Sequence, residues 1–432
     1  MDSRSFSNNK IMTAEIAVMN KQAIALAADS AVTFRTEKNQ KIFISANKIF
    51  CLSDNHPVGV MVYGNASLLQ VPWETVIKTY SKKLGTKRFD KLSDYCKDFL
   101  KFIGDNRVLF PAKEQEKYIS RDVGGYFNYL RDKTLNTIKG KLEKKDKLSR
   151  EDIAVIISDI IREEYEGWQK AKLLRGVTKV KVSNFRRKHI KGIRKIRKNI
   201  FEKTPLNGSL TDKLDQIAIW LFFKFHDNVS NQGTSGLVIA GYGEKDIFPS
   251  LNYYTIEGIA DNFLKYKQDG NFNVSFQMGA AIVPFAQKEM VVRFIEGIDP
   301  TFRNFIAGGL RELAAKYPSV ILDNLKLNAK RNTKLGGQIH AQVKKATDEF
   351  LQKFKKIRRE YFVDPILQVV GFLPKDELAM MAETLITLTS FKRRVSMEAE
   401  TVGGPIDVVV ISRGDGLVWI KRKKYFDKNI QT

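Results

Sequence analysis

Short runs of apolar residues occur in three separate blocks of the chain, close to its start, its middle and its end. Such runs, bounded by Gly, Asp, Asn or Pro, are typical of β-strands, so the fold must contain at least one sheet. The runs are nearly continuous rather than alternating, which indicates strands that are covered on both faces. We predict strands at 15–19, 23–27, 41–44, 48–52 and 58–63, at 236–242, 247–257 and 272–278, and at 406–411 and 417–420.

Segments with helical periodicity separate these blocks. In 66–84 and in 377–394, apolar residues recur three or four positions apart, which predicts amphipathic helices, the second with Asp376 as its N-cap. Long amphipathic segments such as 338–361 suggest a pair of helices docked on the outside. Strands interleaved with helices predict one layered α+β domain that carries two helical insertions. The predicted core is discontinuous and comprises 13–85, 233–287 and 375–425, and the predicted insertions are 86–232 and 288–374.

The composition excludes several classes of protein. Two cysteines cannot form a disulfide framework or a four-thiolate zinc site, and the four histidines do not stand at metal-ligand spacing from one another. No run approaches the roughly 20 apolar residues that cross a bilayer, and the first residues lack the apolar core of a secretory signal. We therefore expect a cytoplasmic protein that has no transmembrane segment and uses neither a metal nor another cofactor.

The charge of the chain is unusual. It carries 73 Lys and Arg against 48 Asp and Glu, a net charge of +25, which suggests contact with a polyanion or an acidic partner. The excess is greatest in 170–203, where 14 of the 34 residues are basic and only Glu202 is acidic. This segment is an amphipathic helix with a basic face or a flexible basic loop, and it could bind nucleic acid without sequence preference, an acidic protein or anionic lipid. The candidate contact residues are Arg186, Arg187, Lys188, Arg194, Lys195, Arg197 and Lys198.

Several segments stand in an informative order along the chain. In the first strand block they are Thr13-Ala-Glu-Ile-Ala-Val, Ala25-Leu-Ala-Ala-Asp29-Ser-Ala-Val-Thr33, Asn47-Lys48-Ile-Phe and Val62-Tyr63-Gly64. Later blocks add Ser235-Gly-Leu-Val-Ile-Ala-Gly241, Tyr253-Tyr-Thr-Ile-Glu-Gly258, the helix at 377–394 and Gly403-Gly-Pro-Ile-Asp-Val-Val-Val-Ile-Ser412. Together these segments resemble a proteasome β-type subunit, a member of the N-terminal-nucleophile (Ntn) hydrolase superfamily. Both predicted insertions lie outside the likeness.

The resemblance implies a four-layer αββα sandwich and a threonine-type peptidase or amidase. In this family the hydroxyl of an N-terminal threonine attacks the amide carbonyl, and its free α-amine takes the proton directly or through a water. The resemblance assigns the nucleophile to Thr13. It assigns to Lys48, with Lys41 as an alternative match, the positive charge that favours ionisation of the nucleophile. It assigns to Asp29 the pairing and orientation of that lysine.

Further site residues follow from the same resemblance. The backbone N–H of Gly64 is expected to donate to the oxyanion, at a position where the absence of a Cβ admits close approach. Thr33 is expected to line the substrate cleft through its backbone. Glu398 or Glu400 is a candidate for the acidic companion of the threonine. Because members of the family assemble into rings, the resemblance also predicts a homo-oligomer that acts on a peptide or protein substrate.

The proposed chemistry requires that the amine of Thr13 be free. Thr13 lies behind twelve residues, so translation from Met12 followed by removal of the methionine would expose it, and so would cleavage of a pro-segment 1–12. We favour the start at Met12, because pro-segments of the family commonly end in glycine and this one does not. The alternative function is a catalytically inactive Ntn-fold protein whose basic insertion binds nucleic acid or an acidic partner. A third is an amidase that acts on a small molecule.

Overall fold

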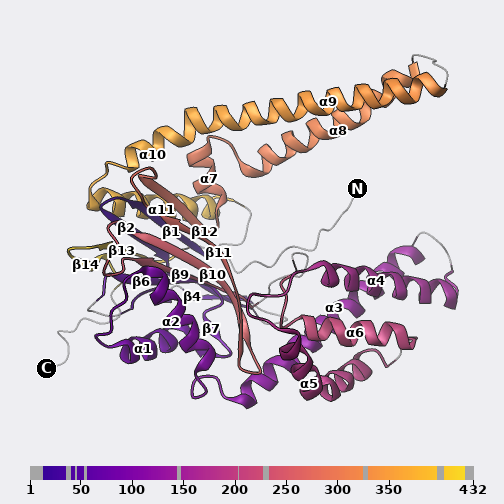
Figure 1. Cartoon of the computed structure of the whole chain (residues 1–432), viewed down its shortest axis with the longest axis horizontal. Coiled ribbons are helices and arrows are strands. Elements are labelled where there is room, and N and C mark those ends of the chain that lie inside the picture. The colour runs from indigo at the N-terminus through magenta and orange to yellow at the C-terminus, as the bar shows by residue number, and fades with distance from the viewer. Residues whose placement is uncertain are drawn as a thin grey trace.

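The computed structural model describes residues 13–35, 40–43, 46–52, 56–143, 147–202, 204–226, 233–324, 329–396 and 403–423. Figure 1 shows two β-sheets stacked against each other, helices on their outer sides, and two long helical units that extend to one side. The predicted mixture of helices and sheets is confirmed. Every strand pair in the described residues is antiparallel.

The first sheet brings strands from the start and the end of the chain together. Its order is β12-β1-β2-β13-β14. The strands are β1 (Ala14–Asn20), β2 (Ala23–Asp29), β12 (Ala280–Ala286), β13 (Ile406–Ser412) and β14 (Gly416–Lys421). Every residue of β1 and β2 is buried, which explains why these two strands are nearly continuous apolar runs.

The second sheet combines strands from the first and middle blocks of the sequence. Its order is β11-β10-β9-β6-β5. The strands are β5 (Ile49–Cys51), β6 (Val58–Gly64), β9 (Ser235–Gly241), β10 (Ser250–Ala260) and β11 (Phe263–Asn273). Two short pairs complete the described strands: β3 (Val32–Arg35) with β4 (Gln40–Phe43), and β7 (Ser67–Leu68) with β8 (Val71–Pro72).

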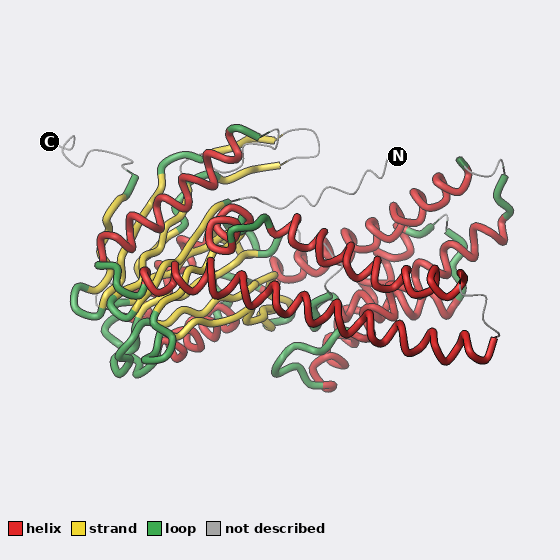
Figure 2. Tube along the Cα trace, turned by 90° about the horizontal axis from the view of Figure 1, so that it is seen from above, coloured by secondary structure: helices red, strands yellow, loops and turns green. Residues whose placement is uncertain are grey.

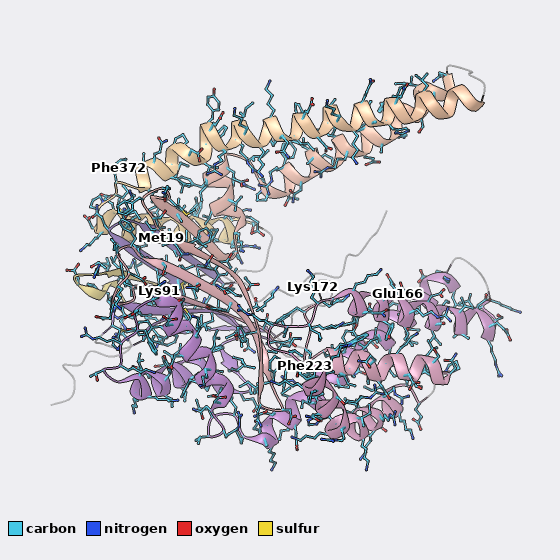
Figure 3. The ribbon with its side chains drawn as sticks, in the orientation of Figure 1. Met19, Lys91, Glu166, Lys172, Phe223 and Phe372 are labelled. Carbon is cyan, nitrogen blue, oxygen red and sulfur yellow. The ribbon has the colours of Figure 1, made fainter. Side chains whose placement is uncertain are left out.

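Apolar side chains fill the space between the sheets and beneath the covering helices. Between the sheets, Met19 and Leu26 of the first sheet belong to one buried cluster with Met61 and Val238 of the second, and Figure 3 labels Met19 there. Helix α11 (Lys375–Arg394) packs on the outer face of the first sheet. Helices α1 (Trp73–Leu84) and α2 (Leu92–Asp105) pack on the outer face of the second.

The middle of the chain forms a helical unit with a core of its own. Its helices are α3 (Ala112–Leu142), α4 (Arg150–Lys170), α5 (Lys179–Ile200) and α6 (Gly208–Trp220). Phe127, Phe185 and Phe223 are buried in that core, and Figure 3 labels Phe223. Helix α2, although it lies within the predicted insertion 86–232, instead joins the core of the second sheet through Phe99 and Ile103.

A second helical unit follows β12. It contains α7 (Glu289–Glu296), α8 (Pro300–Asn324), α9 (Ala329–Arg358), the π-helix η1 (Arg359–Val363) and α10 (Asp364–Val370). Helices α8 and α9 lie side by side as a long hairpin, so the predicted pair of helices is present. The hairpin extends away from the sheets for most of its length instead of docking on them (Figure 1). In the view from above, the helical units again extend to the same side of the sheets (Figure 2).

Some predicted elements are wrong in detail. The strand expected at 272–278 is wrong, because only residues 272–273 of this range lie in a strand, as the end of β11, and β12 begins only at Ala280. Asp376 is not the N-cap of α11, which begins at Lys375, two residues before the predicted start, with Pro374 at the cap position. Asp376 therefore lies in the first turn, where a carboxylate complements the helix dipole. Within the described ranges, every helix is too short or too polar to span a bilayer.

Candidate active site

The start of β1, the end of β2 and the residue before β5 meet at one end of the stacked sheets. Glu15 of β1 pairs with Ala28 of β2 in an antiparallel register, which brings the preceding Thr13 beside Asp29. Lys48 reaches the same point from the second sheet, where it directly precedes β5. Residues that are separated by up to 35 positions in the sequence thus come together, as the resemblance predicted for Thr13, Asp29 and Lys48.

These residues form one connected polar cluster. Thr13 Oγ1 donates a hydrogen bond of 3.0 Å to Glu15 Oε2. Lys48 Nζ lies 3.1 Å from Glu15 Oε1 and also forms an ion pair with Asp29 Oδ1. The cluster is closed to solvent, since Thr13, Glu15 and Asp29 are each 1% exposed and Lys48 is 5% exposed.

Backbone groups hold Asp29 in place. The N–H of Ala14 donates to Oδ1 at 3.1 Å, and the N–H of Gly403 donates to Oδ2 at 3.0 Å. Both oxygens of the carboxylate are therefore occupied, one of them shared with Lys48. This geometry fixes the carboxylate and, through it, the position of the Lys48 ammonium beside Thr13.

Glu15 is a member of this cluster that sequence reasoning missed. It is the only charged residue of β1, whose other members are apolar apart from the terminal Asn20. Residues i and i+2 of a strand face the same side, so a carboxylate two positions after a candidate nucleophile was the signal that could have revealed it.

Burial and charge together tune the cluster. Burial raises the pKa of Glu15 from 4.5 to about 7; Lys48 opposes this rise, and Asp29 adds to it. Burial alone would lower the pKa of Lys48, but the carboxylates of Asp29 and Glu15 outweigh it and raise the pKa above its ordinary value. Lys48 is therefore a cation at neutral pH, while Glu15 exchanges its proton in that range.

A second buried lysine supports the loops around the cluster. Lys423 Nζ donates to Ser30 Oγ, to Ala46 O and to Asp407 Oδ2, each at 2.6 Å. Ser30 follows Asp29 and Ala46 lies two residues before Lys48, so the end of the described chain ties together the two segments that carry the charged pair. Burial lowers the pKa of Lys423, and Asp407 opposes that shift.

A small pocket lies next to the cluster. It has a volume of about 130 Å³ and is lined, among others, by Asn47, Lys48, Val62, Tyr63, Gly64 and Trp73. Gly64 has φ +80°, and a Cβ there would lie 2.7 Å from the carbonyl oxygen of Thr234. Glycine is thus required at this corner of the pocket. Lys48 belongs both to the pocket and to the cluster, so the pocket adjoins the cluster through this lysine.

The other residues assigned by the resemblance are less informative. Thr33 lies on β3 and pairs with Ile42 of β4, while Lys41, the alternative to Lys48, lies on β4 opposite Phe34. Glu398 and Glu400 lie outside the described residues.

The predicted basic contact residues all lie on α5, which resolves the choice between a helix and a loop for most of 170–203. The structure divides these residues into two groups. Five have polar partners: Arg194 and Arg197 donate to Asp215, Lys188 pairs with Asp261, Arg186 donates to Gln216 and Arg187 donates to Asn184. Lys195 and Lys198 are exposed.

No protein-family model matches the chain, and no curated protein matches it either. In the part of the chain that the structure describes, no three His, Cys, Asp or Glu side chains are grouped so that they could hold a metal ion. The interpretation of the site therefore depends on its own geometry.

Proposed function

We propose that this protein is an Ntn-type hydrolase that cleaves amide bonds with Thr13 as its nucleophile. The observation that carries the proposal is the buried chain of contacts from Thr13 through Glu15 to Lys48 and Asp29. Buried ionisable groups cost stability unless they are paired, so a fold that retains three of them around one hydroxyl is a candidate for chemistry at that hydroxyl.

The likeness to proteasome β-type subunits supports the same proposal. Two stacked antiparallel sheets with helices on both outer sides are compatible with the αββα sandwich that the likeness implies. The resemblance named Thr13, Asp29 and Lys48 from their order in the sequence, and these three residues come together in space.

The proposed reaction begins once Thr13 is the first residue of the chain. Its α-amine takes the hydroxyl proton, directly or through a water, and Oγ1 attacks the amide carbonyl carbon to form a C–O bond. Lys48 stabilises the developing negative charge on Oγ1, and Asp29 holds Lys48 in position. Glu15 accepts a hydrogen bond from the hydroxyl and thereby orients it before the proton moves.

The remaining steps use the pocket side of the site. The backbone N–H of Gly64 donates to the carbonyl oxygen as it becomes an oxyanion. The C–N bond of the substrate breaks, the protonated base gives its proton to the leaving amine, and water hydrolyses the acyl–threonine ester. Thr33 contributes its backbone to the substrate cleft, and the pocket beside Lys48 receives one side chain of a peptide or one group of a smaller amide.

The test combines the mass of the mature chain with hydrolysis of a set of short fluorogenic peptide amides. Chains that begin at Thr13 are expected to cleave at least one of these substrates, and chains that retain residues 1–12 to cleave none. Thr13→Ala is expected to abolish cleavage without loss of folding, whereas the matched change Thr387→Ala, at an exposed position of α11, leaves it unchanged.

Two results would contradict this proposal. The first is hydrolysis that persists in Thr13→Ala, and the second is hydrolysis by chains whose intact mass includes residues 1–12. A native protein that retains those residues and is inactive would instead favour the alternative function, a silent protein of this fold.

A further inference from the structure

Helix α5 carries the densest positive charge in the helical unit α3–α6. Ten of its 22 residues are Lys or Arg, and none is Asp or Glu. Exposed faces of soluble helices usually mix both signs, because opposite charges three or four residues apart stabilise the helix. Because like charges at this density repel one another, carboxylates on neighbouring elements or an external polyanion would stabilise such a helix.

The inner side of α5 has such carboxylates. Phe185 and Ile193 are buried in the core of the unit and fix which side of the helix faces inward. Beside them, the fully buried Asp215 of α6 accepts hydrogen bonds of 2.8 Å from Arg194 and 2.7 Å from Arg197. These contacts dock the helix and account for part of its charge.

On the outer side of α5, four cations have no carboxylate partner within the described part of the chain. Arg187, Lys191, Lys195 and Lys198 are exposed and follow one another at intervals of four, four and three residues, which places them along one face of the helix. We call these four residues the outer stripe. Arg187 donates only to the neutral amide of Asn184, and no ion pair to the three lysines is found among the described residues. The stripe spans about 16 Å at the usual rise per residue.

We infer that the outer stripe of α5 binds the sugar–phosphate backbone of a nucleic-acid duplex without sequence preference. A duplex presents about one phosphate charge per 1.7 Å of its axis, so a stripe of this length faces more phosphates than it has cations. The inference does not depend on the hydrolytic function proposed for Thr13.

The surroundings of the stripe favour nucleic acid over other anionic partners. Helices that bind lipid surfaces expose large apolar side chains toward the membrane, and protein interfaces bury an apolar or aromatic centre. Phe185 and Ile193 of α5 point into the unit instead. The exposed residues of α5 are cations, small or neutral polar residues such as Ser183 and Asn184, and one large apolar residue, Val180, at 69% exposure. Contacts made by cations alone suit a phosphate backbone and give no base readout.

The salt dependence of binding provides a quantitative test. Four phosphate contacts predict a slope of log K against log salt near −3.6, and hence a loss of affinity of about 100-fold between about 50 and 200 mM salt. Removal of the three lysines should bring the slope to about −1 and weaken binding at low salt by tenfold or more.

The experiment measures fluorescence anisotropy of a labelled mixed-sequence DNA duplex with the full chain. The triple variant Lys191→Gln/Lys195→Gln/Lys198→Gln is expected to lose binding as stated, while replacement of the same lysines by Arg retains it. A matched control, Lys82→Gln/Lys101→Gln/Lys344→Gln, removes the same charge from exposed positions of α1, α2 and α9 and should bind nearly as the unmodified chain does.

Three outcomes would overturn the inference. Equal losses in the triple variant and the control would mean that only net charge matters. Binding that is insensitive to salt would exclude phosphate contacts of this kind. Tighter binding to anionic-lipid vesicles or to an acidic polypeptide than to the duplex would assign the stripe to a different partner.

Discussion

Replacement of Glu15 by Gln should change how the stability of the fold depends on pH. Glu15 is buried, and burial raises its pKa from 4.5 to about 7. Gln has nearly the same shape and can still accept the hydrogen bond from Thr13, but it does not titrate. The substitution therefore isolates the energetic consequence of placing an ionisable group at this position.

The sign and size of the effect follow from linkage. Between pH 4.5 and about 7 the folded protein holds a proton on Glu15 that the unfolded chain has lost, so the free energy of unfolding falls as pH rises through this window. The stabilising contribution is complete below the unfolded pKa and is lost once pH exceeds the folded pKa. A shift of this size corresponds to about 3 kcal/mol at 1.36 kcal/mol for each pKa unit.

Urea denaturation at several pH values between about 5 and 8 measures this contribution. As pH increases, the unmodified chain should lose stability relative to Glu15→Gln. Between about pH 5 and 8, the difference in the free energy of unfolding between the two proteins should change by nearly 3 kcal/mol. Glu166→Gln, the same change at an exposed position of α4, should leave the pH dependence almost unaltered. If the curves for the unmodified chain and Glu15→Gln run parallel across this range, the reasoning about the buried carboxyl is refuted.

Two further substitutions test the site through stability. Lys48→Met leaves the buried carboxylates of Asp29 and Glu15 without their cation and should cost about 3–5 kcal/mol in urea denaturation, whereas Lys82→Met, at an exposed position of α1, should cost less than about 1. Equal costs would show that the cluster is not electrostatically coupled. Gly64→Ala should cost about 1–3 kcal/mol because of its positive φ and the close carbonyl of Thr234. Gly140→Ala in α3, where no atom lies within 4 Å of the added Cβ, should instead stabilise the fold by up to about 1 kcal/mol. If Gly64→Ala does not lower the free energy of unfolding, the requirement for glycine at position 64 is wrong.

The central strands could be predicted from the sequence because burial dictates their composition. β1, β2, β9 and most of β13 are covered on both sides, so almost every position must be apolar and the runs stand out. The same cause explains why α11 was recognised, since its buried residues recur at helical spacing against the first sheet.

Two of the four edge strands of the stacked sheets, β11 and β12, could not be predicted in this way, although β5 and β14 at the opposite edges were predicted. β11 and β12 lie at the edges of their sheets. An edge strand has a second strand along only one of its two backbone edges, so it can accommodate a proline, and β12 contains Pro284. β11 is half exposed and contains three charged residues among its eleven. The turn that precedes it was a usable signal, because Asp261 and Asn262 both adopt positive φ, as the central residues of a tight hairpin often do.

The candidate site also contains residues that could be predicted from the sequence and one residue that could not. The resemblance to proteasome β-type subunits predicted that Thr13, Asp29 and Lys48 lie together, and they do so because the strands that carry them pair or pack as neighbours. Lys423 could not be found from the sequence. It lies 375 positions after Lys48, and only the closing of the first sheet by β13 and β14 brings it to Ser30 and Ala46.

The positive charge of this chain is used in two physically different ways. Lys48 is withdrawn from water and paired with two carboxylates, so its field acts on one hydroxyl over a few ångströms and is little affected by salt. The outer stripe of α5 remains in water without carboxylate partners in the described residues, so its field reaches a large anion but is screened within about 10 Å at moderate ionic strength. A net charge of +25 therefore says little by itself about function. What matters is which cations the fold has paired with carboxylates. The structure separates the buried Lys48, which is suited to chemistry, from the outer stripe of α5, which is suited to binding.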